Sequence, residues 1–166
     1  MKIGNGYTSL KRDNYNTPFE AWELLLGLLK KTPEDIWCPF YNDGSLKKIL
    51  QKRNISIFHQ NKDFFTYQPN KWSVIIDNIP FSIKEKVFHR CKDLKKPFAC
   101  LVPIDTLERK YFQSLFKDDK KLQIIIPNKR YNFEGYDNRN NVPFKSIWVC
   151  YNMNLKSNNQ IIFQGP

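Results

Sequence analysis

Apolar segments that alternate with helix-like segments constrain the fold of this chain more than any other feature. The strongest is the segment 72–77, where Val74, Ile75 and Ile76 form a β-branched run typical of a strand that is buried on both faces. Further strand-like segments are 36–40, 55–58, 97–102, 122–126, 130–133 and 146–151, and helix-like segments are 18–29, 46–53, 83–94 and 107–116. This alternation predicts an α/β fold with a mostly parallel sheet. The last strands have no strong helix between them, which predicts an antiparallel hairpin at one edge.

The length of 166 residues fits a single domain with a buried core. Hydrophobic residues at 41% and aromatic residues at 15% exclude a disordered or low-complexity protein. We expect residues 1–12 to be loose and residues 13–157 to form the domain. Residues 158–166 are predicted to be a tail outside the fold, because 163–166 resemble part of a protease-cleavage site added for expression.

The chain lacks the sequence signals of a membrane or exported protein. No apolar run approaches the roughly 18 residues of a membrane-spanning helix, and residues 1–12 have no apolar signal-peptide core. The cysteines form no CxxC pair and, with the two histidines, no zinc-binding pattern, so we expect buried thiols in a reducing compartment and no metal. They are Cys38, Cys91, Cys100 and Cys150. These features predict a cytoplasmic protein without a membrane partner.

The chain is strongly basic, with 27 Lys and Arg against 16 Asp and Glu and a net charge of +11. Such a balance serves solubility, or it indicates a polyanionic partner, most often a nucleic acid. The segment 129–139 interleaves basic and aromatic residues in a way that suits a phosphate backbone and stacked bases. The predicted nucleic-acid contacts are Lys84, Lys129, Arg130, Tyr131, Phe133 and Arg139. A solvated surface with hairpin anchors is the alternative interpretation of the same residues.

Two loops, 41–45 and 78–82, directly follow predicted strands. In an open parallel sheet the ligand lies at the carboxyl ends of the strands, so we expect both loops to line one cleft. The second loop places an amide at Asn78 and a ring at Phe81, with Pro80 between them. The Asn78 oxygen and the Ile79 carbonyl can each accept a hydrogen bond from an exocyclic amine, and the ring can stack on a base. A β-turn with a hydrophobic anchor is the alternative.

The order of these segments resembles the phage-type DNA N6-adenine methyltransferases, the Dam-like family, over residues 13 to about 152. The segment 13–18, D-N-Y-N-T-P, resembles the family's D-x-Y-x-T-P segment. The segment 37–44, W-C-P-F-Y-N-D-G, resembles its D-P-F-x-G-x-G cofactor loop, and 63–65, D-F-F, resembles its acidic-aromatic pair. The segment 78–81, N-I-P-F, resembles the catalytic N-P-P-F motif. The resemblance implies a Rossmann-like class I methyltransferase fold.

The resemblance also implies S-adenosyl-L-methionine as the methyl donor and adenine N6 in DNA as the acceptor. The implied catalytic residues are Asn78, Ile79, Pro80 and Phe81. The implied cofactor-binding residues are Tyr15, Thr17, Pro18, Pro39, Phe40, Asn42, Gly44, His59, Asp63, Phe64 and Asn78, of which His59 is as readily a strand-end residue. Little or no separate target-recognition domain is expected, since 128–142 is the one insertion-like segment. A viral or phage setting in a host cytoplasm is implied.

Three positions depart from the family pattern. Ile79 stands at the first proline of the catalytic motif, Cys38 at an acidic position and Asn42 at the first glycine of the cofactor loop. Asparagine tolerates a left-handed backbone, so the loop can still turn there. Two alternatives stay open: methylation of adenine in RNA, and a non-catalytic relative that binds a nucleic acid or a protein.

Overall fold

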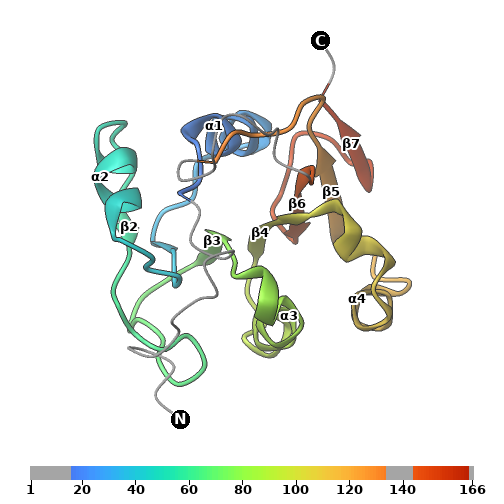
Figure 1. Cartoon of the computed structure of the whole chain (residues 1–166), viewed down its shortest axis with the longest axis horizontal. Helices are drawn as coiled ribbons and strands as arrows, with labels where there is room; N and C mark the ends of the chain where they lie inside the picture. The colour runs from blue at the N-terminus through green and yellow to red at the C-terminus, as the bar shows by residue number, and fades with distance from the viewer. Residues whose placement is uncertain (1–15, 134–143, 165–166) are drawn as a thin grey trace.

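The computed structural model describes residues 16–133 and 144–164, and these form an α/β fold around a seven-stranded mixed sheet (Figure 1). The strand order is β2-β1-β3-β4-β6-β5-β7. Four of the six strand pairs are parallel, and only β6 runs antiparallel to its two neighbours, β4 and β5. The strands are β1 (Ile36–Trp37), β2 (Ile57–Phe58), β3 (Val74–Asn78), β4 (Phe98–Pro103), β5 (Leu122–Ile126), β6 (Ser146–Tyr151) and β7 (Ile161–Phe163). This architecture is consistent with a Rossmann-like fold and confirms the predicted α/β class.

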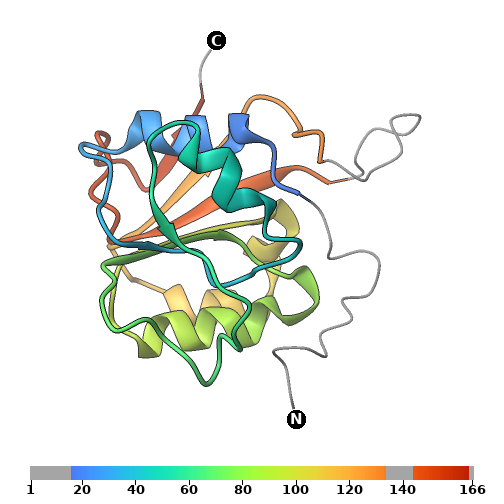
Figure 2. The ribbon, with the colours of Figure 1, turned by 90° about the vertical axis from the view of Figure 1, so that its left-hand side faces the viewer.

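Helices cover both faces of the sheet, α1 and α2 on one side and α3 and α4 on the other (Figure 2). They are α1 (Phe19–Leu28), α2 (Ser45–Gln51), α3 (Lys84–Asp93) and α4 (Lys110–Phe116), and short 3₁₀ turns span Phe81–Ile83 and Ile104–Glu108. In β3, Val74 and Ile76 pack toward α1, and Ile75 packs toward α3. Burial on both faces explains why the strand is a continuous apolar run.

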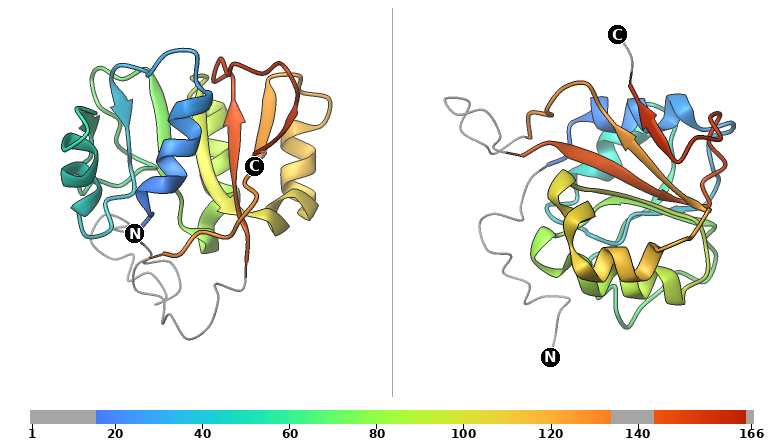
Figure 3. Two further views of the ribbon diagram at one scale, coloured as in Figure 1. Left: turned by 90° about the horizontal axis from the view of Figure 1, so that it is seen from above. Right: turned by 90° about the vertical axis from the view of Figure 1, so that its right-hand side faces the viewer.

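The predicted antiparallel hairpin is only partly correct. Strands β5 and β6 do pair antiparallel, but β6 lies inside the sheet, between β4 and β5. The edge is formed by β7, which runs parallel to β5 (Figure 3). The predicted strand at 130–133 is wrong, because Tyr131 and Phe133 are buried in the core on the α1 face without belonging to a strand.

The exclusion of residues 158–166 from the fold is wrong for the segment that forms β7. Ile162 is only 8% exposed and packs into the core on the α1 face. The Gln123 side chain also donates hydrogen bonds to the carbonyls of Ser157 (2.8 Å) and Asn159 (2.9 Å). The chain is therefore part of the sheet at least as far as Phe163.

All four cysteines are free and buried, as the sequence predicts. Burial raises the pKa of the Cys38, Cys100 and Cys150 thiols, so they stay protonated and behave as small apolar side chains.

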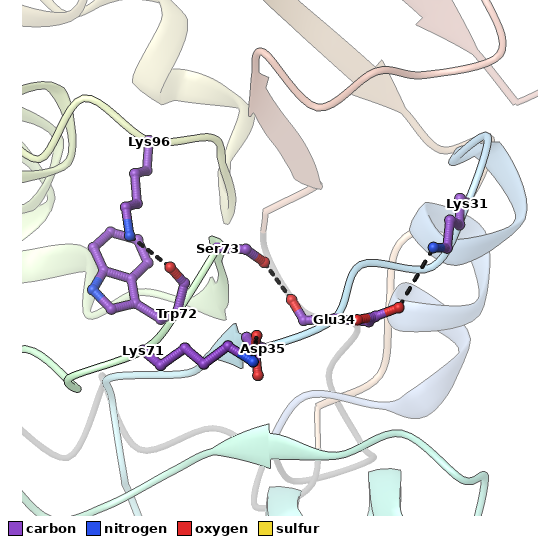
Figure 4. Close-up of polar contacts among 7 residues, drawn as sticks. All are labelled: Lys31, Glu34, Asp35, Lys71, Trp72, Ser73 and Lys96. Atoms are coloured by element: carbon purple, nitrogen blue, oxygen red, sulfur yellow. Dashed lines mark hydrogen bonds and ion pairs between the residues drawn. The ribbon is translucent and has the colours of Figure 1, made fainter.

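The amino ends of β1, β3 and β4 are joined by polar contacts at the surface (Figure 4). The Lys71 ammonium lies 3.1 Å from the Asp35 carboxylate, and the Ser73 hydroxyl donates to the Glu34 carbonyl. Lys96 donates a 2.6 Å hydrogen bond to the Trp72 carbonyl, and its ammonium lies 4.2 Å from the centre of the Trp72 ring. These contacts align the strands at the end opposite to the loops 41–45 and 78–82.

Candidate functional site

A small cleft of about 50 Å³ opens where the loops after β1 and β3 meet. Its position follows from the topology: from β1 the chain moves outward to β2, and from β3 it moves the other way to β4. The gap between β1 and β3 is therefore the switch point of the sheet, where open α/β folds bind ligands at the carboxyl ends of the strands. The cleft is lined by Asn16, Thr17, Phe40, Tyr41, Asp43, Ser45, Leu46, Ile49, His59, Asp77, Asn78 and Pro80. The expectation that both loops line one cleft is correct.

Asp77 ties the two loops together from beneath the cleft. Its carboxylate accepts a 2.8 Å hydrogen bond from the Phe40 N–H and a 2.9 Å bond from the Asn78 N–H. The residue is only 2% exposed. Burial raises the pKa of the Asp77 carboxyl, and the two N–H donors oppose that rise. One buried side chain thus fixes the relative position of Phe40 and Asn78.

The loop after β1 turns through two left-handed residues, Asn42 (φ 48°) and Gly44 (φ 76°). The turn is closed by the Gly44 N–H, which donates 2.8 Å to the Tyr41 carbonyl. Asparagine thus supports the left-handed turn that the sequence analysis expects at position 42. A β-carbon on Gly44 would lie 2.5 Å from Tyr41 Oη, so the absent side chain makes room for the Tyr41 ring.

The segment before α1 is clamped onto this loop through Asn16. The Asn16 side chain donates 3.1 Å to Asp43 and accepts 2.9 Å from the Asn42 amide. Hydrogen bonds from Ser45 and Asn16 lower the pKa of Asp43, so this carboxylate is charged at the mouth of the cleft. Thr17 lines the cleft and Pro18 directly precedes α1, whereas Tyr15 lies outside the described residues.

His59 follows β2 and closes the side of the cleft. Its Nδ1–H donates 2.8 Å to the Cys38 carbonyl, and its ring stacks on Tyr41 with centroids 5.0 Å apart. Burial lowers the pKa of His59, although the carbonyls of Cys38 and Tyr41 act against this. The imidazole is therefore neutral at physiological pH and can offer Nε2 as an acceptor.

Six described residues of the predicted cofactor set do not line the cleft: Pro18, Pro39, Asn42, Gly44, Asp63 and Phe64. Pro39 is buried beneath the loop. Phe64 is 3% exposed and packs in the core against Trp37 and Phe40. Asp63 accepts a 2.9 Å hydrogen bond from the Phe65 N–H and so stabilises its own turn. Phe64 supports Phe40 from behind.

The segment 78–81 places its residues at different depths. Asn78 and Pro80 line the cleft, whereas the Ile79 side chain is 1% exposed and anchors the loop in the core on the α3 face. Phe81 begins a 3₁₀ turn and meets Phe144 edge to face, with centroids 5.3 Å apart. This contact joins the loop after β3 to the segment that enters β6.

Two of the six predicted nucleic-acid contacts, Tyr131 and Phe133, are contradicted by burial. Tyr131 and Phe133 are 1% and 3% exposed, so neither ring can stack on a base. Lys84 is paired with Asp105 (3.6 Å), and Lys129 with Glu20 (2.5 Å). Arg130 is exposed, and Arg139 lies outside the described residues. The residue spacing could not distinguish aromatic side chains that pack inward from those that face solvent.

Sequence reasoning assigned no site role to several residues that line the cleft. The sequence could have indicated Asp43, because an aspartate just before a helix can accept a hydrogen bond from a backbone N–H of its first turn. Here Asp43 accepts a 2.9 Å hydrogen bond from the Ser45 N–H. Leu46 and Ile49 share the inward face of α2, which their spacing of three residues indicates. Asn16 and Tyr41 act through contacts with distant segments, which no local pattern shows.

Comparisons with protein-family models and with curated proteins find no match to this chain. Within residues 16–133 and 144–164, no group of three or more metal-ligating side chains comes together. Across the same described residues, none of the helices has the length and apolar character that crossing a membrane requires.

Proposed function

We propose that this chain is a class I methyltransferase that uses S-adenosyl-L-methionine to methylate adenine N6 in DNA. The observation that supports the proposal is the convergence of three segments far apart in sequence. Residues 16–18, 40–44 and 77–80 surround one cleft, tied together by Asp77 and Asn16. These are the segments in which the sequence resembles the family's cofactor and catalytic motifs.

The residues around the cleft fit a nucleoside-type cofactor. The enclosed volume of the cleft, about 50 Å³, lies below the usual range of small-ligand sites, about 300–1,000 Å³, so the support comes from the side chains that line the cleft and not from its size. Phe40 and Tyr41 offer ring surfaces, and Thr17, Asp43 and His59 offer hydrogen-bonding groups. When bound, the cofactor supplies a methyl group already activated by its positively charged sulfur.

The role of the chain in this proposal is to orient the acceptor amine. The Asn78 side chain and the Ile79 carbonyl would accept the two amine hydrogens of adenine. Holding both hydrogens directs the nitrogen lone pair toward the methyl group, which is positioning and electrostatic catalysis. Asp77 fixes the Asn78 backbone through a 2.9 Å hydrogen bond, so the amide enters the cleft at a set position.

Phe81 would receive the flipped base by stacking beside Asn78. The ring is only partly buried and is supported at its side by Phe144. Flipping a base out of a duplex costs a few kcal/mol, and stacking on an aromatic ring recovers part of that free energy. The proposed setting is a virus or phage whose enzyme works in a host cytoplasm.

A non-catalytic relative is the second candidate, and the Gly44–Tyr41 contact favours it. Gly44 is the glycine that this loop retains, and Tyr41 occupies the space beside it. The Tyr41 ring in that space leaves less room for a ligand to contact the loop backbone. Methylation of adenine N6 in RNA is the third candidate, since adenine in single-stranded RNA carries the same amine.

The deciding experiment measures methyl transfer from labelled S-adenosyl-L-methionine to unmethylated duplex DNA, single-stranded DNA and RNA. Asn78→Ala should lower transfer at least about 100-fold, as expected when one catalytic hydrogen-bonding group is removed. Its unfolding curve in urea should match that of the wild type. The control Asn70→Ala changes an exposed asparagine at the end of the sheet opposite to the cleft and should keep full activity. Absence of transfer and of cofactor binding by calorimetry in the wild type would refute the enzyme.

A further inference from the structure

Between Asp43 and Asp63, at one edge of the molecule, the chain carries positive charge and no acidic residue. Between residues 44 and 62 the sequence contains five basic side chains and no aspartate or glutamate. They are Lys47, Lys48, Lys52, Arg53 and Lys62. This stretch forms α2, β2 and the turns around them, at one end of the sheet (Figure 1).

The four lysines of this stretch, which we call the lysine edge, are not held by any carboxylate that the structure describes. All four are exposed, and none makes an ion pair within the described residues. By contrast, Lys84, Lys92 and Lys129 are held by carboxylates on other elements. Arg53 is engaged differently, because its guanidinium lies 3.5 Å from the centre of the Phe19 ring and donates to the Ile49 carbonyl.

The lysine edge borders the candidate site through α2. Leu46, Ile49 and Leu50 face the cleft and the core, which leaves Lys47, Lys48 and Lys52 on the outer side of the helix. A second groove runs along this outer side, lined by Lys47, Gln51, Asn54 and Ser56 together with Ile55 and Ile57. Ammonium, amide and hydroxyl groups are the side chains that contact nucleic-acid phosphates.

We propose that the lysine edge binds the phosphate backbone of the DNA whose adenine enters the cleft. The inference deepens the proposed function and rests on it for the identity of the substrate. It also replaces the interface predicted from sequence, whose aromatic side chains are buried and two of whose cations are ion-paired. Unpaired ammonium groups bind phosphate without first breaking an ion pair, and counterion release from DNA adds to the affinity.

The test compares two triple variants that remove the same charge. The first is Lys47→Gln, Lys48→Gln and Lys52→Gln; the control is Lys117→Gln, Lys120→Gln and Lys121→Gln, exposed lysines on the α4–β5 side of the sheet. Affinity for a fluorescein-labelled 20-mer is measured by anisotropy between 50 and 200 mM KCl, as duplex DNA, single-stranded DNA and RNA. Urea unfolding checks that both variants fold.

The lysine-edge variant should bind duplex DNA at least about tenfold more weakly at 100 mM salt. The slope of log K against log salt should become shallower by about 0.9 for each phosphate that the variant no longer neutralises, whereas the control should change affinity less than about twofold. Equal weakening of both variants, no weakening of the first, or no DNA binding by the wild type would overturn the proposal. Lysine-dependent binding to RNA alone would overturn DNA as the partner.

These outcomes distinguish a failure of the proposed DNA-binding surface from a failure of the proposed methyltransferase activity. Lysine-dependent DNA binding without methyl transfer would leave the surface standing and refute the proposed activity. Methyl transfer to DNA, with DNA affinity that does not depend on the lysine edge, would refute the proposed binding surface and leave the proposed activity standing.

Discussion

The two ends of strands β1 and β3 are held together in different ways. At the amino ends, Lys71 pairs with Asp35, and the Lys71 side chain is 82% exposed. At the carboxyl ends, the buried Asp77 carboxylate bridges the backbones of Phe40 and Asn78. Water screens the first contact and is excluded from the second. The carboxyl ends therefore depend on a buried contact and the amino ends on an exposed one, so substitutions at the two ends should have very different effects.

Asp77→Ala should have the largest effect on stability. It removes the acceptor for two backbone N–H groups and leaves a small void beneath the cleft. Each unsatisfied buried donor costs about 1–3 kcal/mol, so we expect a loss of about 2–5 kcal/mol in the free energy of unfolding. Urea denaturation measures it, and binding of the proposed cofactor, followed by calorimetry, should weaken in the fraction that remains folded. A loss below about 1 kcal/mol would show that the two loops are held by other contacts.

Asp77→Asn isolates the charge of the same group. Burial raises the pKa of Asp77 above its ordinary 3.8, so the folded state binds this proton more tightly than the unfolded state. The contribution of the carboxyl to stability is then present at low pH and is lost as the pH rises through the raised pKa. Between pH 4 and pH 7 the wild type should lose stability relative to Asp77→Asn. The opposite trend would mean that the two N–H donors dominate over burial.

Gly44→Ala should have an intermediate effect, and Gly27→Ala in α1 is its matched control. Alanine at φ 76° costs about 1–2 kcal/mol, and its β-carbon would displace the Tyr41 ring that stacks on His59. Gly27 has no neighbouring atom within 4 Å of an added β-carbon and lies in a helix, so alanine there should stabilise by about 0.5–1 kcal/mol. Thermal unfolding of both variants is the measurement. Equal shifts in the same direction would refute the special role of Gly44.

The arrangement of the sheet was predictable to the extent that it depends on burial. The apolar run in β3 indicated a strand covered on both faces, and the loop positions followed from the rule for strand ends. Strand β7 was excluded because 163–166 resemble a protease-cleavage site, and its burial is slight: Ile161 is 53% exposed and Phe163 is 72% exposed. It forms because β5 offers a free edge, which is a property of the folded sheet.

The cleft was predictable as a place, but its internal contacts were not. Asn78 and Gly44 stand out locally, one after a strand and the other in a turn. The roles of Asp77 and Asn16 depend on partners 37 and 27 residues away, so no spacing rule could assign them. The prediction for Tyr131 was wrong for a related reason. Its alternation with polar residues suggested that the ring is exposed to solvent, whereas tertiary packing buries it.

Substitutions at the amino ends of the strands should have the smallest effects. Lys71→Ala removes an exposed ion pair and should change the free energy of unfolding by about 0–0.5 kcal/mol. Lys96→Ala also loses a 2.6 Å hydrogen bond and its packing on the Trp72 ring, so its cost should be larger, at about 1 kcal/mol. Neither change should alter cofactor binding, because both side chains lie at the end of the sheet opposite to the cleft. Urea denaturation and calorimetry on both variants measure this. A weakening of cofactor binding as large as that of Asp77→Ala would mean that the two ends of the sheet are coupled, and that the cleft is not ordered by Asp77 alone.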